Sequence, residues 1–309
     1  MYDILPDIHG QSEKLRAALR NLGYAERKGA WRHPDPDRSV VFLGDFIDRG
    51  PENAAVIDIV RRMIDAGTAR AIMGNHELNA LQFHTSRNGI PLRPHSEKNF
   101  RQHGSFLAEF PLGAPRTAEV LDWMRSLPLF AEFGGMRAVH ACWDEDHIAT
   151  IREHRPDGTL DEAALVESAT EGTALREAVE VTAKGPEHKL PEPHGFHDKD
   201  GIWRTEARIA WWATGAASWR EIAASVPDPA QLPDTAPPEE VMSMRYPQDA
   251  PPVFYGHYWL TGNRPVLQAH NAVCLDYSAG RDGPVVSYSA APGTTRLDPA
   301  DLAVHGPGA

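Results

Sequence analysis

The sequence predicts a layered α/β fold in which the sheet is mostly buried. Over residues 1–140, short apolar runs of the strand type alternate with stretches whose apolar residues recur at helical spacing. This alternation is typical of strands that helices connect and cover. The chain has 309 residues, of which 41% are hydrophobic and 24% charged, so it can bury a sizeable core. We expect a single domain over residues 1–309 that carries one insert.

The first half of the chain supplies the strands and helices in alternation. We expect strands at residues 2–6, 39–45 and 69–75 and helices at residues 12–22 and 54–67. Leucines three and four residues apart form an apolar stripe along the first helix, and Gly23 ends it. Residues 127–141 (LPLFAEFGGMRAVHA) predict two further strands that turn at Gly134 and Gly135.

An insert of about a hundred residues, 144–250, precedes a later strand at 251–258 (PPVFYGHY). We expect the insert to be largely helical, with helices near residues 144–154, 161–183 and 203–213. A proline-rich segment from Pro227 to Pro252 predicts a stiff connector. Residues 272–289 (AVCLDYSAGRDGPVVSYS) then predict a hairpin that turns at RDG.

Composition and charge argue against two broad classes of function. The formal net charge of -12 argues against electrostatic binding of nucleic acid over an extended surface, because such binding needs a basic surface. The chain has no apolar run of about eighteen residues, and its first motif begins too close to Met1 for a secretory leader. We therefore expect a cytoplasmic protein with no membrane contact and no extended nucleic-acid binding. Its two cysteines are too few for a disulfide framework.

Residues that can ligate a metal ion follow the end of one predicted strand after another. Because ligands bind at the carboxyl ends of strands in open α/β sheets, we expect these residues to converge. They are Asp7 and His9, Asp45 and Asp48, Asn75 and His76, His140, and His257. One such residue alone is more often a cap or a satisfied polar group, but the ordered series predicts a shared site.

The donor set is mixed oxygen and nitrogen without thiolate, which favours Mn, Fe, Zn or Mg over a structural zinc site. The donors are too many for one ion, so we expect two divalent ions, with manganese as the first choice. Asp7 and His9 stand two positions apart on an extended segment and can therefore bind one ion together. Asp45 is placed to bridge both ions.

The motifs DIHGQ, GDFIDRGP and GNHE, followed by VHA and YGHY, resemble the successive motifs of the calcineurin-like metallophosphoesterases. The DRG brings the resemblance close to the phosphoprotein phosphatase group, which includes bacterial Ser/Thr phosphatases and diadenosine tetraphosphate hydrolases. It covers residues 1 to about 143 and 251 to about 290. The resemblance implies a four-layer αββα sandwich with a dinuclear metal centre. It also implies that the insert contributes a cap or a substrate-selecting region.

The same resemblance implies a role for each metal ligand. Asp7 and His9 would hold the first ion, and Asp45 would bridge the pair. The second ion would be held by Asn75, His140 and His257.

The catalytic roles follow from the resemblance in the same way. His76 would act as the general acid, backed by Asp48, and Arg49 and Asn75 would bind the phosphate of the substrate. Two ions lower the pKa of a shared water, and the resulting bridging hydroxide would attack phosphorus in line. A histidine held by a carboxylate can protonate the expelled alkoxide at physiological pH. The guanidinium of Arg49 has the planar fork that suits two phosphate oxygens.

The insert contains a segment with mixed basic and aromatic character, DKDGIWRTEARIAWW. Within it, Arg204, Arg208 and Trp211 or Trp212 are spaced to share a helix face. Such a face could hold the phosphate of a substrate together with a nucleotide base or an acidic phosphopeptide. Alternatively, the tryptophans lie in the core and the arginines extend outwards from it.

These residues leave three functions open. The first is a phosphatase that acts on phosphomonoesters, with a phosphorylated small molecule, a nucleotide or a phosphopeptide as substrate. The second is a hydrolase of dinucleoside polyphosphates such as diadenosine tetraphosphate, for which the Arg/Trp segment is the main hint. The third is a catalytically silent binding module, which would have no chemical need of the complete ligand set together with Asp48 and His76.

Three positions depart from the pattern of the family. Pro6 stands where glycine is usual, His140 continues as HACW where HGG is common, and Tyr258 follows the last histidine. The second departure leaves a second phosphate-binding arginine without a position. Proline fits a strand end, so we expect the first strand to survive Pro6.

Overall fold

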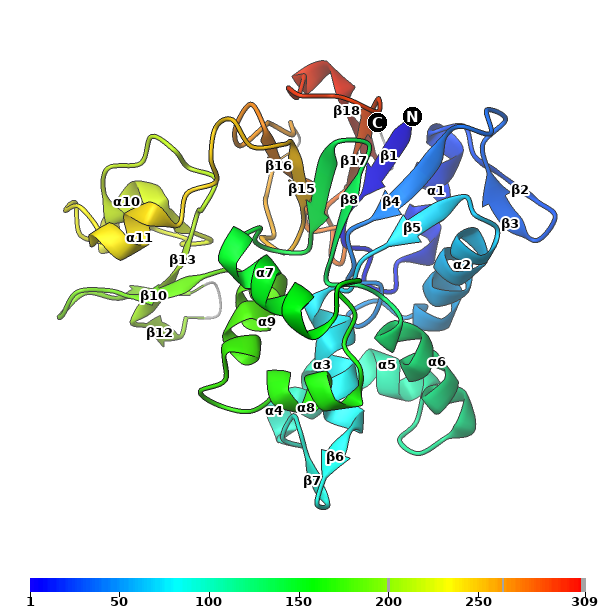
Figure 1. Cartoon of the computed structure of the whole chain (residues 1–309), viewed down its shortest axis with the longest axis horizontal. Coiled ribbons are helices and arrows are strands. Elements are labelled where there is room, and N and C mark those ends of the chain that lie inside the picture. The colour runs from blue at the N-terminus through cyan, green and yellow to red at the C-terminus, as the bar shows by residue number, and fades with distance from the viewer. Residues whose placement is uncertain (199–200, 263, 307–309) are drawn as a thin grey trace.

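The structure, a computed structural model, describes residues 1–198, 201–262 and 264–306 (Figure 1). Its central strands form two mixed sheets, one of five strands and one of four. The helices of the first half of the chain are α1 (Ser12–Asn21), α2 (Asn53–Asp65), α3 (Asn75–His84), α4 (Glu97–Gln102), α5 (Gly104–Glu109) and α6 (Pro115–Arg125). The two helices predicted in this region, α1 and α2, are confirmed.

The five-stranded sheet has the order β18-β17-β1-β4-β5. Its members are β1 (Tyr2–Leu5), β4 (Ser39–Phe42), β5 (Ala69–Ala71), β17 (Val285–Ala290) and β18 (Leu302–His305). The first three are parallel and confirm the predicted strands, while β17 and β18 run antiparallel to their neighbours. Each parallel strand ends before the polar residues that follow it, so these residues lie in turns at one edge of the sheet.

The four-stranded sheet has the order β16-β15-β9-β8. Its members are β16 (Ala272–Cys274), β15 (Val253–Tyr255), β9 (Met136–Val139) and β8 (Phe130–Phe133). β8 and β9 form the predicted antiparallel hairpin. The turn places Gly134 at a φ of 55° and Gly135 at 82°, a left-handed conformation that favours glycine at both positions.

Buried residues of the two sheets form one apolar cluster. Val41 of the first sheet belongs to it together with Ala138 and Phe254 of the second. Its sequence neighbours Val40 and Phe42 belong instead to a cluster that includes buried residues of α1 and α2. Because successive side chains of a strand alternate between faces, the first sheet is covered on one face by the second sheet and on the other by helices.

The insert is helical only in its first half, so the expectation of a largely helical insert is wrong. Its helices there are α7 (Glu145–His154), α8 (Glu162–Ser168) and α9 (Ala174–Lys184). The single helix predicted at 161–183 is divided, because Gly172 adopts a φ of 79° and Thr173 caps α9 by accepting a hydrogen bond from the amide of Arg176 at 3.2 Å.

The second half of the insert forms small sheets and short helices. These are β10 (Glu187–Lys189), β11 (Phe196–His197), β12 (Trp203–Arg204), β13 (Glu206–Ile209), β14 (Ala223–Ala224), α10 (Trp219–Ile222), η1 (Pro229–Gln231) and α11 (Glu239–Ser243). The helix predicted near 203–213 is therefore wrong. Burial alternates along this stretch, with Ala207 and Ile209 inside and Arg208 outside, which is the period of a strand.

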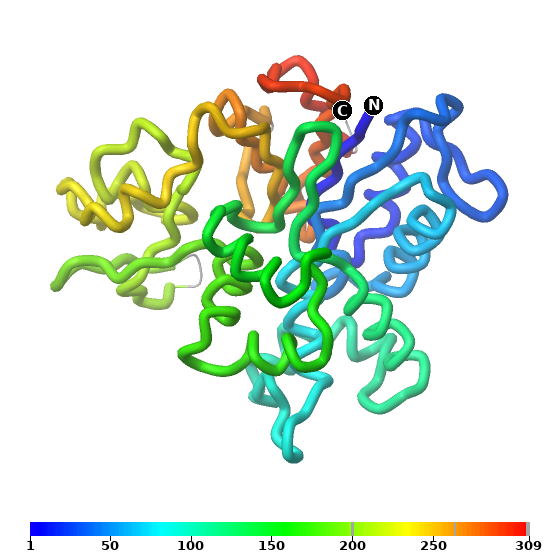
Figure 2. Tube along the Cα trace, viewed as in Figure 1, coloured from blue at the N-terminus to red at the C-terminus, as the bar shows by residue number. Residues whose placement is uncertain are grey.

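This part of the insert forms a lobe beside the four-stranded sheet, far from α2 in the trace of Figure 2. It has its own apolar cluster, in which Leu232 and Val241 of the proline-rich segment pack with Trp219. The segment predicted as a stiff connector thus supplies part of a small core. None of the helices in the described ranges is both long and apolar enough to cross a membrane.

The hairpin predicted at residues 272–289 is also wrong. β16 pairs in parallel with β15, whereas β17 pairs antiparallel with β1, so the chain passes from one sheet to the other. Each strand finds a buried neighbour in its own sheet, and this outweighs the local turn signal of RDG. The remaining elements are the hairpins β2 (Ala25–Arg27) with β3 (Ala30–Arg32) and β6 (Ser86–Arg87) with β7 (Ile90–Pro91), and the short helix η2 (Pro299–Asp301).

Candidate metal centre and substrate cavity

The turns after five strands bring the predicted metal ligands together. Each ligand follows the strand that the sequence assigned to it, and all are at most 9% exposed. They are Asp7 and His9 after β1, Asp45 after β4, Asn75 after β5, His140 after β9, and His257 after β15. Pro6 follows the last paired residue of β1, so the hydrogen bond that it cannot donate is not missing from the sheet.

Asp45 lies at the centre of this cluster. Its Oδ2 is 3.5 Å from Nε2 of His9, and its Oδ1 is 3.4 Å from Nε2 of His140. Two sets of donors lie within 4.8 Å of one another and could hold an ion, namely His9, Asp45 and His76, and Asp7, Asp45 and His140. Asp45 is common to both sets, which is the geometry that a bridging carboxylate requires.

Backbone carbonyls fix the orientation of two imidazoles. Nδ1 of His9 lies 2.9 Å from the carbonyl oxygen of Ile47, and Nδ1 of His140 lies 2.7 Å from that of Leu43. A carbonyl oxygen only accepts, so Nδ1 donates in both rings and Nε2 faces the site. Burial lowers the pKa of His9 to about 3, so this ring is neutral and its Nε2 carries a lone pair.

The donor set fits divalent cations. Nε2 of His9 is buried without a hydrogen-bond partner among the described residues, and it faces a carboxylate oxygen that also only accepts. Burial disfavours the imidazolium of His140, but the charges of Asp45 and Asp7 outweigh it and raise the pKa of His140 to about 10. The negative charge of the buried carboxylates is unfavourable unless it is compensated, and divalent ions would supply the compensating positive charge.

Asn75 links the remaining ligands. Its Oδ1 lies 3.1 Å from Nε2 of His140 and 2.8 Å from Nδ1 of His257. Space around the carboxylates is kept by glycine: a Cβ on Gly256 would lie 2.0 Å from Oδ1 of Asp7, and one on Gly74 would lie 2.2 Å from Oδ1 of Asp45. A side chain at either position would displace a ligand.

His76 is held by a carboxylate beside this cluster. Its Nδ1 lies 2.6 Å from Oδ2 of Asp48, so Nε2 is the atom that faces the cavity. Burial lowers the pKa of His76, but the charge of Asp45 and the hydrogen bond with Asp48 outweigh it and raise the pKa above its ordinary value. His76 therefore keeps a proton that it can donate near neutral pH.

The chain matches the family of calcineurin-like phosphoesterases over residues 3–258. It belongs to this family.

Curated relatives of this phosphoesterase include bis(5'-nucleosyl)-tetraphosphatases. The asymmetrical enzyme PrpE of Halalkalibacterium halodurans is 40% identical over 75 residues, which is 24% of this chain and 30% of the relative. The symmetrical enzyme of Vibrio cholerae is 30% identical over 155 residues, 48% of each chain. The phosphoesterase thus matches less than half of the length of these relatives.

Solved structures show the same fold. A cold-active protein-tyrosine phosphatase of a psychrophilic Shewanella species is 15% identical and has a TM-score of 0.50, with 93% of this phosphoesterase and 75% of the other chain covered. A protein serine/threonine phosphatase from Saccharomyces cerevisiae is 14% identical with a TM-score of 0.50, covering 98% and 78%. The phosphoesterase accordingly has the α/β metallophosphoesterase fold with mixed sheets.

The loop that carries Asp48 and Arg49 has an unusual backbone. Both residues adopt a left-handed φ, 68° and 66°, and the amide of Asp48 donates to Oδ1 of Asn53 at 2.6 Å. Gly50 fits against His9, because a Cβ there would meet the carbonyl oxygen of His9 at 2.3 Å. This loop turns the guanidinium of Arg49 over the ring of Trp259, 4.1 Å from its centroid.

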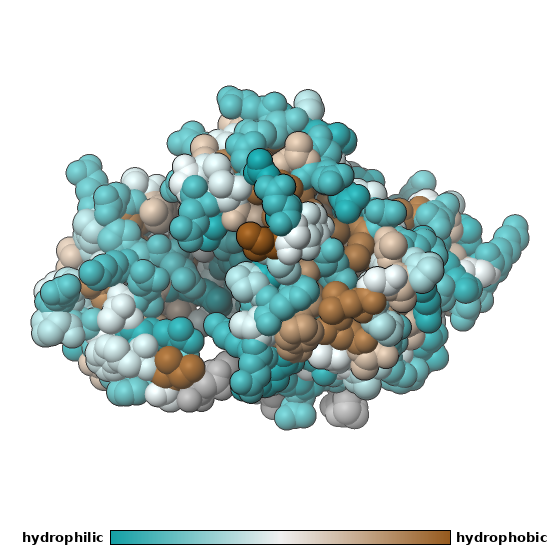
Figure 3. Space-filling view, turned by 90° about the horizontal axis from the view of Figure 1, so that it is seen from below, coloured by the Kyte–Doolittle hydropathy of each residue, from teal (hydrophilic) through white to brown (hydrophobic). Residues whose placement is uncertain are grey.

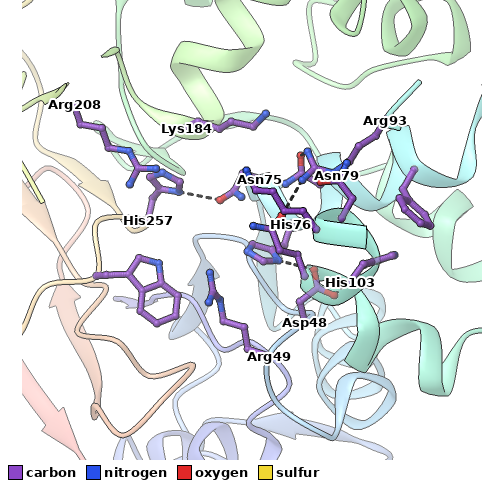
Figure 4. Close-up of a pocket in the computed structure, with 15 residues that line it drawn as sticks. Asp48, Arg49, Asn75, His76, Asn79, Arg93, His103, Lys184, Arg208 and His257 are labelled. Carbon is purple, nitrogen blue, oxygen red and sulfur yellow. Dashed lines mark hydrogen bonds and ion pairs between the residues drawn. The ribbon is translucent and has the colours of Figure 1, made fainter. Parts of the chain in front are cut away.

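A cavity of about 330 Å³ opens in front of His76 in this phosphoesterase. Seen from below, the surface is hollowed beside the lobe of the insert, and hydrophilic residues surround the hollow (Figure 3). Asp48 is the one carboxylate in the lining within the described ranges. Five cationic side chains line it as well: Arg49, Arg93, Lys184 and Arg208, which Figure 4 labels, and Lys98.

The structure separates the two arginines that the sequence singled out in the insert. Arg208 of β13 lines the cavity beside His257, whereas Arg204 lies outside the lining and pairs with Asp198 at 2.7 Å. The tryptophans follow the alternative in which they lie in the core. Trp211 donates from Nε1 to the carbonyl oxygen of Ala141 at 2.9 Å and to the hydroxyl of Tyr258 at 3.1 Å.

Tyr258 thereby explains one departure from the family pattern. Its side chain is 2% exposed, and its hydroxyl connects the turn of His257 to Trp211 of the insert. The insert is therefore anchored directly behind two of the candidate metal ligands, because Ala141 follows His140 and Tyr258 follows His257.

Several residues of the site escaped the sequence analysis. His103 is 5% exposed, and its Nδ1 lies 2.9 Å from Oδ1 of Asp48. Arg93 and Lys98 precede it in a segment that carries no motif, and Asp276 lies in the segment assigned to a hairpin. Asp276 accepts hydrogen bonds from the amides of Trp259 at 2.7 Å and Ser278 at 2.9 Å. No sequence pattern distinguishes these residues from ordinary surface polar groups.

Proposed function

We propose that this phosphoesterase hydrolyses phosphomonoesters at a centre of two divalent ions, with manganese as the preferred metal. The observation that carries the proposal is that Asp45 belongs to two overlapping sets of metal donors, one with His9 and His76 and one with Asp7 and His140. The motif pattern of the family, and not these sets, groups Asp7 with His9. Asp7, His9 and Asp45 would hold the first ion. Asp45, Asn75, His140 and His257 would hold the second.

Two such ions, when bound, would acidify a shared water and neutralise charge on the phosphoryl oxygens. The protein itself supplies the grip on the phosphate. Arg49 lies on one side of His76, braced by Trp259, and Arg208 lies beside His257. Each guanidinium can donate two hydrogen bonds to phosphate oxygens, and Asn75 can add one from its amide.

His76 would donate the proton from Nε2 to the leaving oxygen as the bond between phosphorus and that oxygen breaks. Its Nδ1 is held by Asp48 at 2.6 Å, and the second oxygen of Asp48 is held by His103 at 2.9 Å. The resulting imidazole would recover a proton from the attacking water, so no net charge remains on the protein. A positioned acid of this kind contributes about a hundred- to ten-thousand-fold in rate.

We infer that the two sheets and their covering helices make the four-layer αββα sandwich, with residues 1–309 as one domain. The insert at 144–250 then acts as a substrate-selecting region. Lys184 and Arg208, which both belong to it, line the cavity next to residues of the main sheets. This supports a role in binding over a role as a distant lid.

Hydrolysis of p-nitrophenyl phosphate by the purified, manganese-loaded protein tests this proposal. We expect turnover that is lost with a chelator and restored with manganese. His76→Asn should keep the metal content of the wild type and turn over phenyl phosphate at least a hundredfold more slowly, since the acid is lost. A metal-loaded protein without phosphatase activity would refute the proposal.

A second candidate is the hydrolysis of dinucleoside polyphosphates. The five cations of the cavity favour it, because a single phosphoryl group does not need so many, and two curated relatives are named for this reaction. Product analysis separates the two candidates. Release of nucleoside phosphates from diadenosine tetraphosphate at far higher kcat/KM than phosphate from a phosphopeptide would favour the second.

A further inference from the structure

The cavity extends well past the metal ligands along α3. Asn75, His76, Asn79 and Phe83 all line it from the same helix. Eight residues of α-helix span about 12 Å, so the lined face is longer than one phosphoryl group. The far end of the cavity must therefore receive the part of the substrate that lies beyond the phosphate at the metal centre.

The far end is strongly cationic. Arg93 and Lys98 of α4 line it, and Lys184 at the end of α9 lies between Arg93 and Arg208 (Figure 4). Arg93 donates to the amide oxygens of Asn79 at 2.8 Å and Gln102 at 3.1 Å, both of them uncharged. Within the ranges that the structure describes, no carboxylate pairs with Arg93 or Lys98, and Lys184 pairs with Glu180 at 2.6 Å.

Fold stability does not account for this concentration of charge. The chain has a net charge of -12, so carboxylates are abundant elsewhere. Arg93 and Lys184 nevertheless face the same cavity. Burial, with a smaller contribution from the charge of Arg93, outweighs the effect of Glu180 and lowers the pKa of Lys184. The two cations repel each other, and an anion that enters the cavity between them would relieve this repulsion.

The position of His76 assigns this end of the cavity to the leaving group. Nδ1 of His76 is tied to Asp48, so Nε2 is the atom that can protonate the leaving oxygen. In Figure 4, Arg93 and Asn79 lie on one side of His76, and Arg208 and His257 lie on the other. The phosphoryl group is gripped on the side of His257 and the metal ligands, and the leaving group extends along α3 past His76.

We propose that Arg93, Lys98 and Lys184 form a subsite for an anionic leaving group, and that this group is a polyphosphate such as the one in a nucleoside polyphosphate. The inference rests on the second candidate of the proposed function, the hydrolysis of polyphosphates, and adds the residues that hold the leaving group. The oxygen of water bonds to phosphorus, and the bond from phosphorus to the bridging oxygen of the anhydride breaks. The bridging oxygen takes the proton from His76, which recovers it from the water. The three cations stabilise the charge that remains on the released polyphosphate.

Competitive inhibition tests the subsite, with p-nitrophenyl phosphate as the reporter substrate. Tripolyphosphate is compared with inorganic phosphate at a fixed concentration of free manganese, because tripolyphosphate itself binds the metal. We expect tripolyphosphate to bind the wild type more tightly than phosphate. In Arg93→Ala and Lys98→Ala the ratio of the two inhibition constants should fall about tenfold each, the effect of losing a hydrogen bond to a charged group.

Arg101→Ala is the matched control. Arg101 lies on α4 with Lys98, is 76% exposed and pairs with Glu97 at 3.2 Å outside the cavity lining. This variant should keep the ratio of inhibition constants and the turnover of the wild type. Titration calorimetry of tripolyphosphate into metal-free protein compares the affinities of wild type and variants without turnover. If the wild type hydrolysed nothing, the proposed function would be refuted, but the subsite could still be tested by calorimetry.

Two results would overturn the subsite. If Arg93→Ala and Lys98→Ala weakened phosphate and tripolyphosphate equally, the cations would serve the phosphoryl group and not the leaving group. If an acidic phosphopeptide bound the wild type more tightly than tripolyphosphate and lost more affinity in the two variants, the leaving group would be a peptide and the polyphosphate assignment would be wrong.

Discussion

Nδ1 of His103 lies 2.9 Å from Oδ1 of Asp48, on the oxygen of the carboxylate that His76 does not use. His103 also stacks on Phe106 with ring centroids 4.7 Å apart, so its ring has little freedom. Its Nε2 meets Nε2 of His84 at 3.2 Å. Burial, followed by the charge of His103, lowers the pKa of His84 to about 4, so His84 is neutral. The chain of contacts fixes Asp48, and through it the ring of His76.

His103→Ala should lower turnover through the orientation of the acid. We expect kcat for phenyl phosphate, a poor leaving group, to fall about tenfold, with a smaller loss for p-nitrophenyl phosphate, which needs little protonation. Metal content and KM should stay at the wild-type values. His103→Gln should restore part of the rate, because its amide can still donate to Asp48. His95→Ala, which removes a neighbouring imidazole without a contact to Asp48, is the control, and an equal loss with both substrates would contradict the role.

The hydrogen bonds of the Asp48 carboxylate should make part of the unfolding free energy depend on pH. Burial opposes its ionisation, but hydrogen bonds from His103 and His76 outweigh burial and lower the pKa of Asp48 to about 2 from its ordinary value of 3.8. The stabilisation is complete above the ordinary pKa and disappears as the pH falls through about 2. The difference in unfolding free energy between metal-free wild type and Asp48→Asn should therefore shrink by about 2 kcal/mol between pH 5 and pH 2. Urea titrations at each pH measure it, and a constant difference would show that the carboxylate is not paired.

Substitution of single candidate ligands should change how many metal ions the protein retains. His9→Ala should lose the first ion and His257→Ala the second, so that each variant retains about one ion per chain after dialysis against limiting manganese. Asp45→Asn should lose most of both, because its carboxylate belongs to both donor sets. Elemental analysis of the purified variants gives the counts. Loss of both ions from His9→Ala with full retention by Asp45→Asn would contradict the bridging role.

Trp211 should couple the insert to the metal centre. Trp211→Phe removes the hydrogen bond to the carbonyl oxygen of Ala141 and leaves that buried acceptor unpaired, which should cost about 1–3 kcal/mol of unfolding free energy. Because Arg208 lies on the same segment of the insert, KM should rise as well. Trp219→Phe, in the separate cluster of the lobe, should destabilise without a change in KM. An unchanged KM in Trp211→Phe would limit this contact to a structural role.

The convergence of the candidate metal ligands could be predicted because each stands after the end of a strand, and the parallel arrangement of strands brings such ends together. Asp7 and Asp45 were therefore predictable from local apolar runs alone. His103, Arg93 and Lys98 could not be predicted, since they reach the site from short helices and loops whose packing depends on the whole fold. Arg208 was singled out for its spacing on a helix, yet it reaches the cavity from a strand, because burial of Ala207 and Ile209 imposes the period of two.

The side chains that hydrogen-bond to the loops of the site could not be predicted from the sequence either. Glu77 lies in the first turn of α3, and its carboxylate accepts hydrogen bonds from the amides of Asp45 and Phe46, both at 2.8 Å. Burial raises the pKa of Glu77 to about 7. Such contacts between a side chain and a distant backbone follow from tertiary structure, which no spacing in the sequence encodes.

The most direct test of the account is a titration of metal-free protein with manganese in which bound metal and hydrolysis of p-nitrophenyl phosphate are measured on the same samples. We predict that two ions bind per chain and that turnover appears in step with the second. Full turnover at one ion per chain, or no turnover with two ions bound, would contradict the central claim.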